Sequence, residues 1–136
     1  MSKWCDEGET LVANILFKST DPSTGFNPLY IGLYMNTSEP AEADSLTDIT
    51  EPTGGTYARK SLARDSAWSV SGDEATGDQV IHAASGAAWG NVYGYFITDV
   101  ASGTVGNLIA VEDFSDGPYN VGDGDSVKIT PKITIS

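Results

Sequence analysis

Cysteine and histidine are almost absent from the 136-residue sequence, which contains one of each, and this scarcity excludes several kinds of site. A single cysteine, Cys5, cannot form an internal disulfide bond or build a cysteine-based zinc cage. A single histidine, His82, cannot build a histidine-rich metal centre. The sequence therefore predicts a fold held together by its hydrophobic core, with no bound metal and no cofactor.

Basic residues are also scarce, with seven Lys and Arg against nineteen Asp and Glu, so the formal net charge is -12. Such a surface repels nucleic-acid phosphates and anionic lipid headgroups, so we expect neither nucleic-acid nor membrane-surface binding. No apolar run approaches the roughly 18 residues that a membrane span needs. The first ten residues, MSKWCDEGET, lack the order of a secretory signal. The acidic balance fits either a well-hydrated surface or one that docks onto a basic partner.

Helical patterning is confined to one stretch near the start of the chain, from Asp6 to Lys18. Asp6 is placed to cap a helix, and Glu9 follows three residues later, where acidic groups suit the positive end of the helix dipole. The apolar side chains recur at helical spacing, as Leu11, Val12, Ile15 and Leu16. A helix this short is marginal alone and must lie on another surface. That surface is either its own domain or, with Trp4 alongside, a neighbouring subunit.

The run WGNVYGYFITD, from Trp89 to Asp99, predicts the central strand of a sheet. Both sets of alternating residues carry large apolar or aromatic groups, as expected of a strand that is covered on its two faces. β-Branched and aromatic residues also suit a pleated, packed surface. Gly90 and Gly94 leave room where another backbone or an aromatic ring approaches closely.

Further short runs of β-branched and aromatic residues recur at intervals of roughly 8–12 residues, separated by Gly- and Pro-rich turns. Pro131 denies its strand a backbone donor, so an edge position or a break is expected there. The pattern predicts about seven to nine strands in a sandwich or jelly roll, as one domain over residues 1–136. The additional strands are expected at 29–35, 56–62, 67–70, 79–84, 107–114, 119–121 and 126–135.

Residues 36–55 form a long acidic loop rich in Ser, Glu, Pro, Ala, Asp and Thr. A loop of this length without secondary structure is often functional or mobile. Its carboxylates are Glu39, Glu42, Asp44, Asp48 and Glu51. Because no histidine and no repeated ligand spacing accompanies them, a solvated loop is the better interpretation than a metal site.

Candidate catalytic groups are few. No Gly-x-Ser-x-Gly motif surrounds any serine, and His82 lies in a predicted strand, so no catalytic triad is expected. Paired carboxylates are harder to dismiss, because a glycosidase needs only two acids over a sugar cleft, which Trp68 and Trp89 could line. Core packing explains these tryptophans more simply. The sequence therefore predicts no catalytic residue.

The order of the short motifs resembles that of small virion structural proteins of tailed bacteriophages. A short N-terminal helix precedes LYIGLYM (29–35), and the acidic loop and GGTYAR (54–59) follow. Trp68, AAWGNV (87–92) and YGYFITD (93–99) come next. The order ends with NLI (107–109), GPYNVGDGDSVKIT (117–130) and ITIS (133–136). The resemblance covers nearly the whole chain.

This resemblance implies an all-β, jelly-roll-like β-sandwich with one short N-terminal helix and no enzymatic centre. The first expectation is a capsid decoration (cement) protein that binds and stabilises the assembled head. It would be made in the host bacterial cytoplasm and lie on the outer surface of the virion, as a homo-oligomer, with a trimer as the expected form, bound to the major capsid protein. The alternative is a tail or head-fibre module that binds a host receptor or glycan. A sugar-active enzyme is the third hypothesis.

Two segments are the candidates for contacting partners, the helical N-terminal arm over 1–18 and the acidic loop over 36–55. We expect removal of residues 1–18 to abolish particle binding and to leave the β domain folded. The candidate partner-binding residues are Trp4, Leu11, Val12, Ile15, Leu16, Glu39, Glu42, Asp44 and Asp48.

Overall fold

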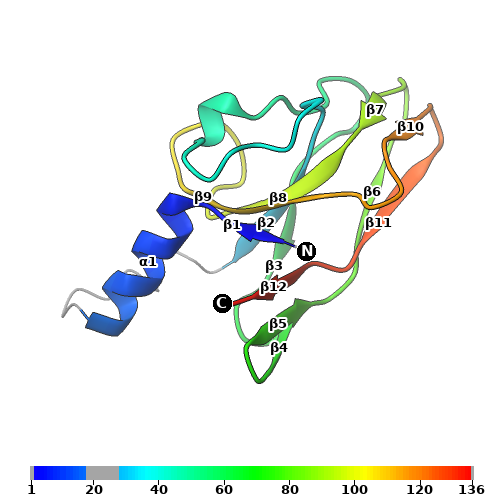
Figure 1. The fold of residues 1–136 in the computed structure, drawn as a ribbon. Coiled ribbons are helices and arrows are strands. Elements are labelled where there is room, and N and C mark those ends of the chain that lie inside the picture. Colours follow the sequence, from blue (N-terminus) through cyan, green and yellow to red (C-terminus); the bar gives the residue numbers. More distant parts are fainter. Residues whose placement is uncertain (1, 18–27, 136) are drawn as a thin grey trace.

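The computed structural model describes residues 2–17 and 28–135, and this part of the chain is a β-sandwich with one α-helix (Figure 1). The described residues contain twelve strands and one turn of 3-10 helix, η2, at Leu46–Asp48. No helix among them is long and apolar enough to cross a membrane. The elements are β1 Lys3–Trp4, α1 Asp6–Phe17, β2 Leu29–Tyr34, β3 Lys60–Leu62, β4 Trp68–Ser71, β5 Glu74–Gly77, β6 Val80–Ala83, β7 Gly90–Val92, β8 Gly94–Thr98, β9 Leu108–Asp113, β10 Tyr119–Val121, β11 Ser126–Ile129 and β12 Lys132–Thr134.

The first layer is a five-stranded antiparallel sheet in the order β1-β9-β8-β2-β3, with β8 at its centre. All five residues of β8 are buried, and Ile97 pairs with Ile31 on one side and with Ala110 on the other. The predicted central strand is therefore confirmed. β8 and β9 are antiparallel neighbours that are joined by the connection over residues 99–107.

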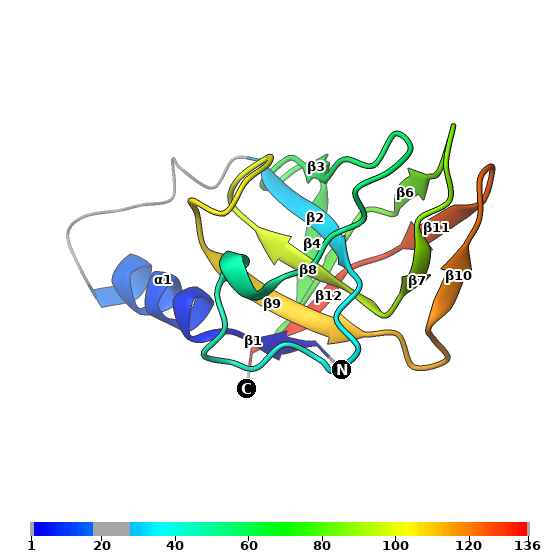
Figure 2. The ribbon, with the colours of Figure 1, turned by 90° about the horizontal axis from the view of Figure 1, so that it is seen from above.

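The second layer is built from shorter pairings. β12, β5 and β4 form a three-stranded sheet, while β11 pairs with β6 and β10 pairs with β7. β11 and β12 follow one another along the chain and are separated by Pro131, which confirms the predicted break. The β6, β7, β10 and β11 strands lie at the end of the molecule remote from α1 (Figure 2).

The main core lies between the layers. Alternate residues of the central strands, such as Ile31, Leu33, Tyr95 and Ile97, pack there against inward side chains of the second layer. Those side chains of the second layer are Val80, Val121, Val127, Ile129 and Ile133. The fold is thus an all-β sandwich with one short helix, as predicted.

A second apolar cluster covers the outer face of the five-stranded sheet. Phe96, Leu108 and Val111 pack there against Leu46, which is supplied by the 36–55 loop. That loop crosses over β8 and β9 in both views (Figures 1 and 2). The central strand is therefore buried on both faces, because a loop takes the place that a third layer would occupy.

The alternation along the central run differs from the prediction at one point. Tyr93 separates β7 from β8, and its backbone N–H donates to the carbonyl of Tyr34 at 2.9 Å. The break changes which face the following residues point to. As a result Val92 packs in the main core with Tyr95, although simple alternation places it with Phe96 on the opposite face.

Several element boundaries also differ from the sequence prediction. The strand expected over 56–62 is shortened to β3, because Gly55 has a positive φ of 52° and the Tyr57 N–H folds back to its carbonyl. The sequence pattern missed β1 and β5, and breaks at Tyr93 and Pro131 divide longer predicted strands. These additions explain why the described strands exceed the predicted seven to nine.

The N-terminal helix lies close to its predicted position. α1 begins at Asp6 and extends to Phe17, whereas the predicted last residue, Lys18, lies outside the described residues. The predicted capping role of Asp6 is wrong. The Cys5 carbonyl accepts the N–H of Glu9 at 3.0 Å, so Cys5 occupies the cap position and Asp6 is already helical.

Candidate partner-binding surface

The root of α1 is built into the five-stranded sheet. β1 pairs with β9, and the Cys5 N–H then donates to the Ile109 carbonyl at 2.9 Å. One turn later Gly8 lies directly on the backbone of Ile109, where any side chain would collide. Glu7 accepts the Leu108 N–H at 2.6 Å. These contacts fix the start and the direction of the helix.

The outer half of α1 carries apolar side chains that the described chain does not cover. Leu11 and Val12 are half-buried, whereas Ile15, Leu16 and Phe17 are 41%, 68% and 82% exposed. The helix projects away from both layers (Figure 1). The sequence analysis leaves two surfaces for this helix to pack on, its own domain or a neighbouring subunit. In the structure its own domain covers only the N-terminal half of the helix.

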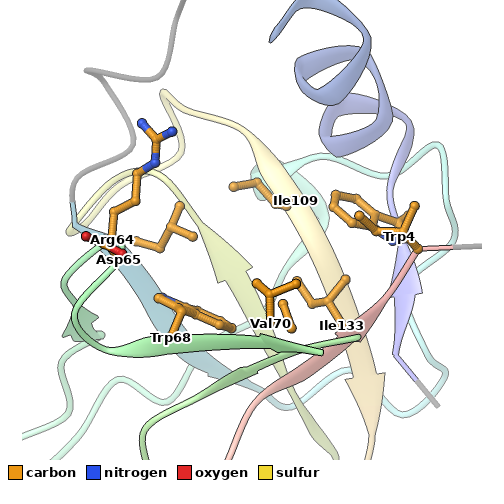
Figure 3. Close-up of a pocket in the computed structure, with 10 residues that line it drawn as sticks. Trp4, Arg64, Asp65, Trp68, Val70, Ile109 and Ile133 are labelled. Atoms are coloured by element: carbon orange, nitrogen blue, oxygen red, sulfur yellow. The ribbon is translucent and has the colours of Figure 1, made fainter. Parts of the chain in front are cut away.

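Beside the root of α1, the two layers separate and leave an open apolar groove of about 1040 Å³ (Figure 3). β4 and β12 form one wall, and β9 and β1 form the other. Eight of the ten residues that line it are apolar or aromatic, namely Trp4, Leu29, Trp68, Val70, Ala75, Ile109, Ile133 and Ile135. We call this feature the Trp4–Trp68 groove.

Among the described residues that line the groove, the charged ones are Arg64 and Asp65, which lie together at one end (Figure 3). The buried Nε1 of Trp68 has no hydrogen-bond partner among the described residues. Trp89 lies elsewhere, in the main core, where its Nε1 donates to the Gly54 carbonyl at 2.8 Å. Among the described residues the groove therefore has one carboxylate, and Trp68 and Trp89 do not converge on a shared sugar cleft.

The groove continues onto the helix. A smaller hollow beside it is lined by Trp4, Glu9, Val12 and Ile135, so Trp4 belongs to both. The indole of Trp4 is held in place because its Nε1 donates to the Thr134 carbonyl at 3.0 Å. The predicted contact residues Trp4 and Val12 are thus brought together with the groove, while Ile15 and Leu16 lie beyond it on the exposed half of α1.

The groove residues outside α1 and β1 are the ones that the sequence prediction missed. Trp68 and Val70 alternate in the short run AWSVS, and Ile133 and Ile135 alternate near the end of the chain. That pattern signals one apolar face on each strand. It does not reveal that β4 and β12 lie where the layers separate.

The predicted acidic contact residues mostly order their own loop. Asp44 accepts the Ala41 N–H at 2.8 Å, and Asp48 accepts the Ser45 N–H at 2.9 Å. The side chain of Glu42 is exposed. None of the loop acids lines the groove, so the structure does not bring them together with Trp4.

Glu39 connects the loop to the N-terminal strand, because it forms an ion pair with Lys3 at 2.8 Å. It also accepts the Asp113 N–H at 3.3 Å. Across residues 2–17 and 28–135 there is no group of three or more side chains that could hold a metal ion. Four of the acids of the 36–55 loop, Glu39, Asp44, Asp48 and Glu51, thus accept local hydrogen bonds or form ion pairs.

A partly buried ion pair fastens two loops to the sheet. Arg59 binds Glu51 through two nitrogens, at 3.0 and 2.8 Å. The same guanidinium donates to the carbonyls of Val100 and Gly103 at 3.0 and 2.9 Å, and it lies 5.2 Å from the centre of the Phe96 ring. The GGTYAR motif therefore supplies a structural tie between the loops over 36–55 and 99–107.

His82 belongs to the core and not to a reactive site. It is 1% exposed, its Nε2 lies 3.1 Å from the Ile31 carbonyl, and its ring stacks on Tyr57. Because a carbonyl can only accept, Nε2 must carry the proton, and within the part of the chain that the structure describes the buried Nδ1 has no hydrogen-bond partner. Burial lowers the pKa of His82 to about 4, so the ring is neutral at pH 7.

Comparison with known families covers both layers and the helix. The family described as podophage GP4 fiber I protein gp80 matches residues 3–135. No curated protein matches the sequence. The family match includes β1, α1 and every strand that lines the Trp4–Trp68 groove. The chain therefore belongs to the family of podophage GP4 fiber I protein gp80, and it is a small structural protein of the bacteriophage virion.

Proposed function

We propose that this protein is a non-enzymatic structural subunit of a fibre on a podophage particle. The observation that carries the proposal is the family match over residues 3–135, which extends across the whole described sandwich. The family is named for a fibre protein, and this favours a fibre over capsid decoration. Attachment to a neighbouring virion protein fits the exposed apolar residues of α1 and the Trp4–Trp68 groove.

The chemistry of the groove supports a protein contact more than a sugar contact. Glycoside hydrolysis requires a pair of carboxylates, and Asp65 is the one acid among the described residues that lines the groove. Recognition of a glycan also needs several convergent polar groups, whereas the walls here are mainly aliphatic and aromatic. The features of this surface therefore fit a structural role better than a sugar-active or glycan-binding role.

The location of the chain on the native particle tests this proposal. Particles that carry an epitope-tagged copy should bind a tag-specific antibody on fibres, as seen by electron microscopy. Particles that lack the gene should lose those fibres and keep the heat and osmotic resistance of their heads. Antibody bound over the head shell, together with weakened heads in the gene deletion, would contradict the fibre proposal and favour decoration.

A further inference from the structure

We propose that a hollow between β10 and β11 binds a neutral saccharide. Both strands lie at the end of the molecule remote from α1, so a ligand held there leaves the helix free for attachment (Figure 2). This inference concerns the purified chain and does not rest on the fibre assignment.

The hollow has a volume of about 410 Å³, which is within the range of pockets that hold small ligands. Its walls differ from those of the Trp4–Trp68 groove, because most of the lining side chains carry a polar group. These polar residues are Tyr119, Asn120, Asp125, Ser126 and Lys128. The other two lining residues, Val121 and Val127, belong to the main core. Several polar groups that converge on one site can orient a polar ligand.

Tyr119 supplies an aromatic surface that is fixed in place. The centre of its ring lies 4.8 Å from the centre of the Phe114 ring, and its phenol donates to the Asp116 carboxylate. The side chain is nevertheless 36% exposed. The C–H groups on one face of a sugar ring are apolar and can pack against such an aromatic face. Because both contacts hold Tyr119 before a ligand arrives, binding costs little side-chain entropy.

Lys128 is a cation that forms no ion pair within residues 2–17 and 28–135, although acids outnumber bases by nineteen to seven in the sequence. Asp125 lines the same hollow, but one of its carboxylate oxygens accepts the Gly122 N–H at 2.8 Å. The ammonium group of Lys128 therefore has three N–H donors to offer to a ligand.

The hollow contains hydrogen-bond acceptors as well as donors. The second carboxylate oxygen of Asp125 accepts no hydrogen bond from the described residues, and the side chains of Asn120 and Ser126 form none with them. A sugar hydroxyl both donates and accepts, so neighbouring hydroxyls can satisfy a carboxylate, an amide and an ammonium group together. An apolar ligand would leave these groups without partners.

Charge favours a neutral sugar over an acidic one. The formal net charge is -12, and Asp116, Asp123 and Asp125 all lie next to β10 or β11 in the sequence, against the single cation Lys128 of the hollow. This field repels a carboxylate or phosphate on the ligand but not a hydroxyl. A peptide that adds to a sheet edge is recognised mainly by main-chain hydrogen bonds. The polar side chains of this hollow therefore favour a saccharide over a peptide.

Binding of the purified full-length chain to an array of neutral and acidic oligosaccharides tests this inference. The wild-type chain should bind neutral members, and NMR titration with the strongest of them should shift the amide signals of β10 and β11 most. Lys128→Ala and Asn120→Ala should keep the fold, because both residues are exposed. Each should weaken sugar binding at least about tenfold, because each removes hydrogen bonds to the ligand.

Lys132→Ala is the matched control, because Lys132 is an exposed lysine on a strand but does not line the hollow. It should bind the sugar as the wild type does. Absence of binding to every saccharide, preference for acidic members, signal shifts centred on the Trp4–Trp68 groove, or an equal loss in the control would overturn the proposal. So would peptides from a display library that bind at β10 and β11 when no sugar does. None of these results would change where an antibody finds the chain on the particle, so failure of this inference is distinguishable from failure of the fibre proposal.

Discussion

At the scale of single residues, Gly94 shows how closely the central strand is packed. A Cβ atom at this position would collide with the Tyr34 phenol and with the Glu112 carbonyl. We expect Gly94→Ala to lower the free energy of unfolding by about 3 kcal/mol, because overpacking displaces neighbours that cannot relax freely. Urea denaturation of the purified chain measures this change.

Gly54→Ala is the control for Gly94→Ala. A Cβ atom at Gly54 meets its nearest neighbour, the Ala87 Cβ, at the ordinary distance of 3.5 Å. The midpoint of unfolding should therefore change little. Equal effects of the two substitutions would mean that the close approach to Tyr34 does not set the cost.

His82 makes stability depend on pH. Its pKa is lowered from 6.5 to about 4, mainly by burial and further by Lys60, while the hydrogen bond to the Ile31 carbonyl and the charge of Glu51 raise it. Between these pH values the unfolded chain binds a proton that the folded protein excludes, so the free energy of unfolding falls as the pH falls. The total loss by pH 4 is about 3 kcal/mol.

Denaturation of the wild type and of His82→Gln at several pH values between 7 and 5 measures this contribution. The glutamine amide can still donate to the Ile31 carbonyl but does not titrate, so the variant should lack this part of the slope. If His82→Gln does not fold, the NMR titration of the wild-type imidazole replaces it. An imidazole that titrates near pH 6.5 in the folded protein would contradict the prediction.

At the scale of elements, the Glu51–Arg59 pair determines how firmly the loops hold the outer cluster. Glu51→Gln leaves the Arg59 guanidinium, whose side chain is 3% exposed, without its anion. We expect a loss of about 3 kcal/mol in the free energy of unfolding. Amide exchange over residues 99–107 should also become faster, because Arg59 holds the Val100 and Gly103 carbonyls. Denaturation and hydrogen exchange measure the two effects.

Glu74→Gln provides the comparison, since it removes the same charge from an exposed pair. The side chains of Lys132 and Glu74 are 56% and 40% exposed. Such pairs contribute at most about 1 kcal/mol. A loss as large as that of Glu51→Gln would show that the reduced negative charge, and not the buried partner, is responsible.

The sequence predicts the elements whose signals are local. The helix near the N-terminus follows from apolar spacing, the central strand from its aromatic and β-branched run, and the break at Pro131 from the missing N–H. β5 has no such signal, because EATG is rich neither in β-branched nor in aromatic residues. It becomes a strand through its pairing with β4 and β12, which the local sequence does not encode.

The candidate surface divides in the same way. The apolar stripe of α1 can be predicted from its helical spacing, and Trp4 from its place just before the helix. Trp4 lies at the groove, and the end of the stripe lies at the exposed tip of the helix. The groove itself is not readable, because Trp68 has the same local pattern whether it lies in the core or at the open end of the sandwich. That difference depends on which strands pair more than fifty residues apart, as Thr76 does with Lys132.

At the scale of the whole molecule, the N-terminal residues serve the fold as well as the surface. β1 forms the edge of the five-stranded sheet, and Cys5 is fully buried in the outer cluster. Removal of residues 1–18 would therefore disturb the sheet together with any partner contact. Substitutions at Leu16 and Phe17 separate the two effects, because they leave β1 and the root of α1 intact.

The two ends of the described chain lie side by side, since the Trp4 indole donates to the Thr134 carbonyl. A circular permutant with a short linker across these ends and new termini at the exposed Gly72, between β4 and β5, should fold. Its free energy of unfolding should stay within about 2 kcal/mol of the wild type, because closing a short loop has a small entropic cost. Urea denaturation measures this value.

New termini placed within β8 provide the contrast, because they would divide the most buried strand, and that permutant should not fold. Survival of both permutants would mean that β8 is not needed as a continuous strand. The bond between Trp4 and Thr134 thus has a consequence for protein engineering. Because the two ends of the described chain are adjacent, a domain fused to either end would be attached at nearly the same place, next to the open end of the sandwich.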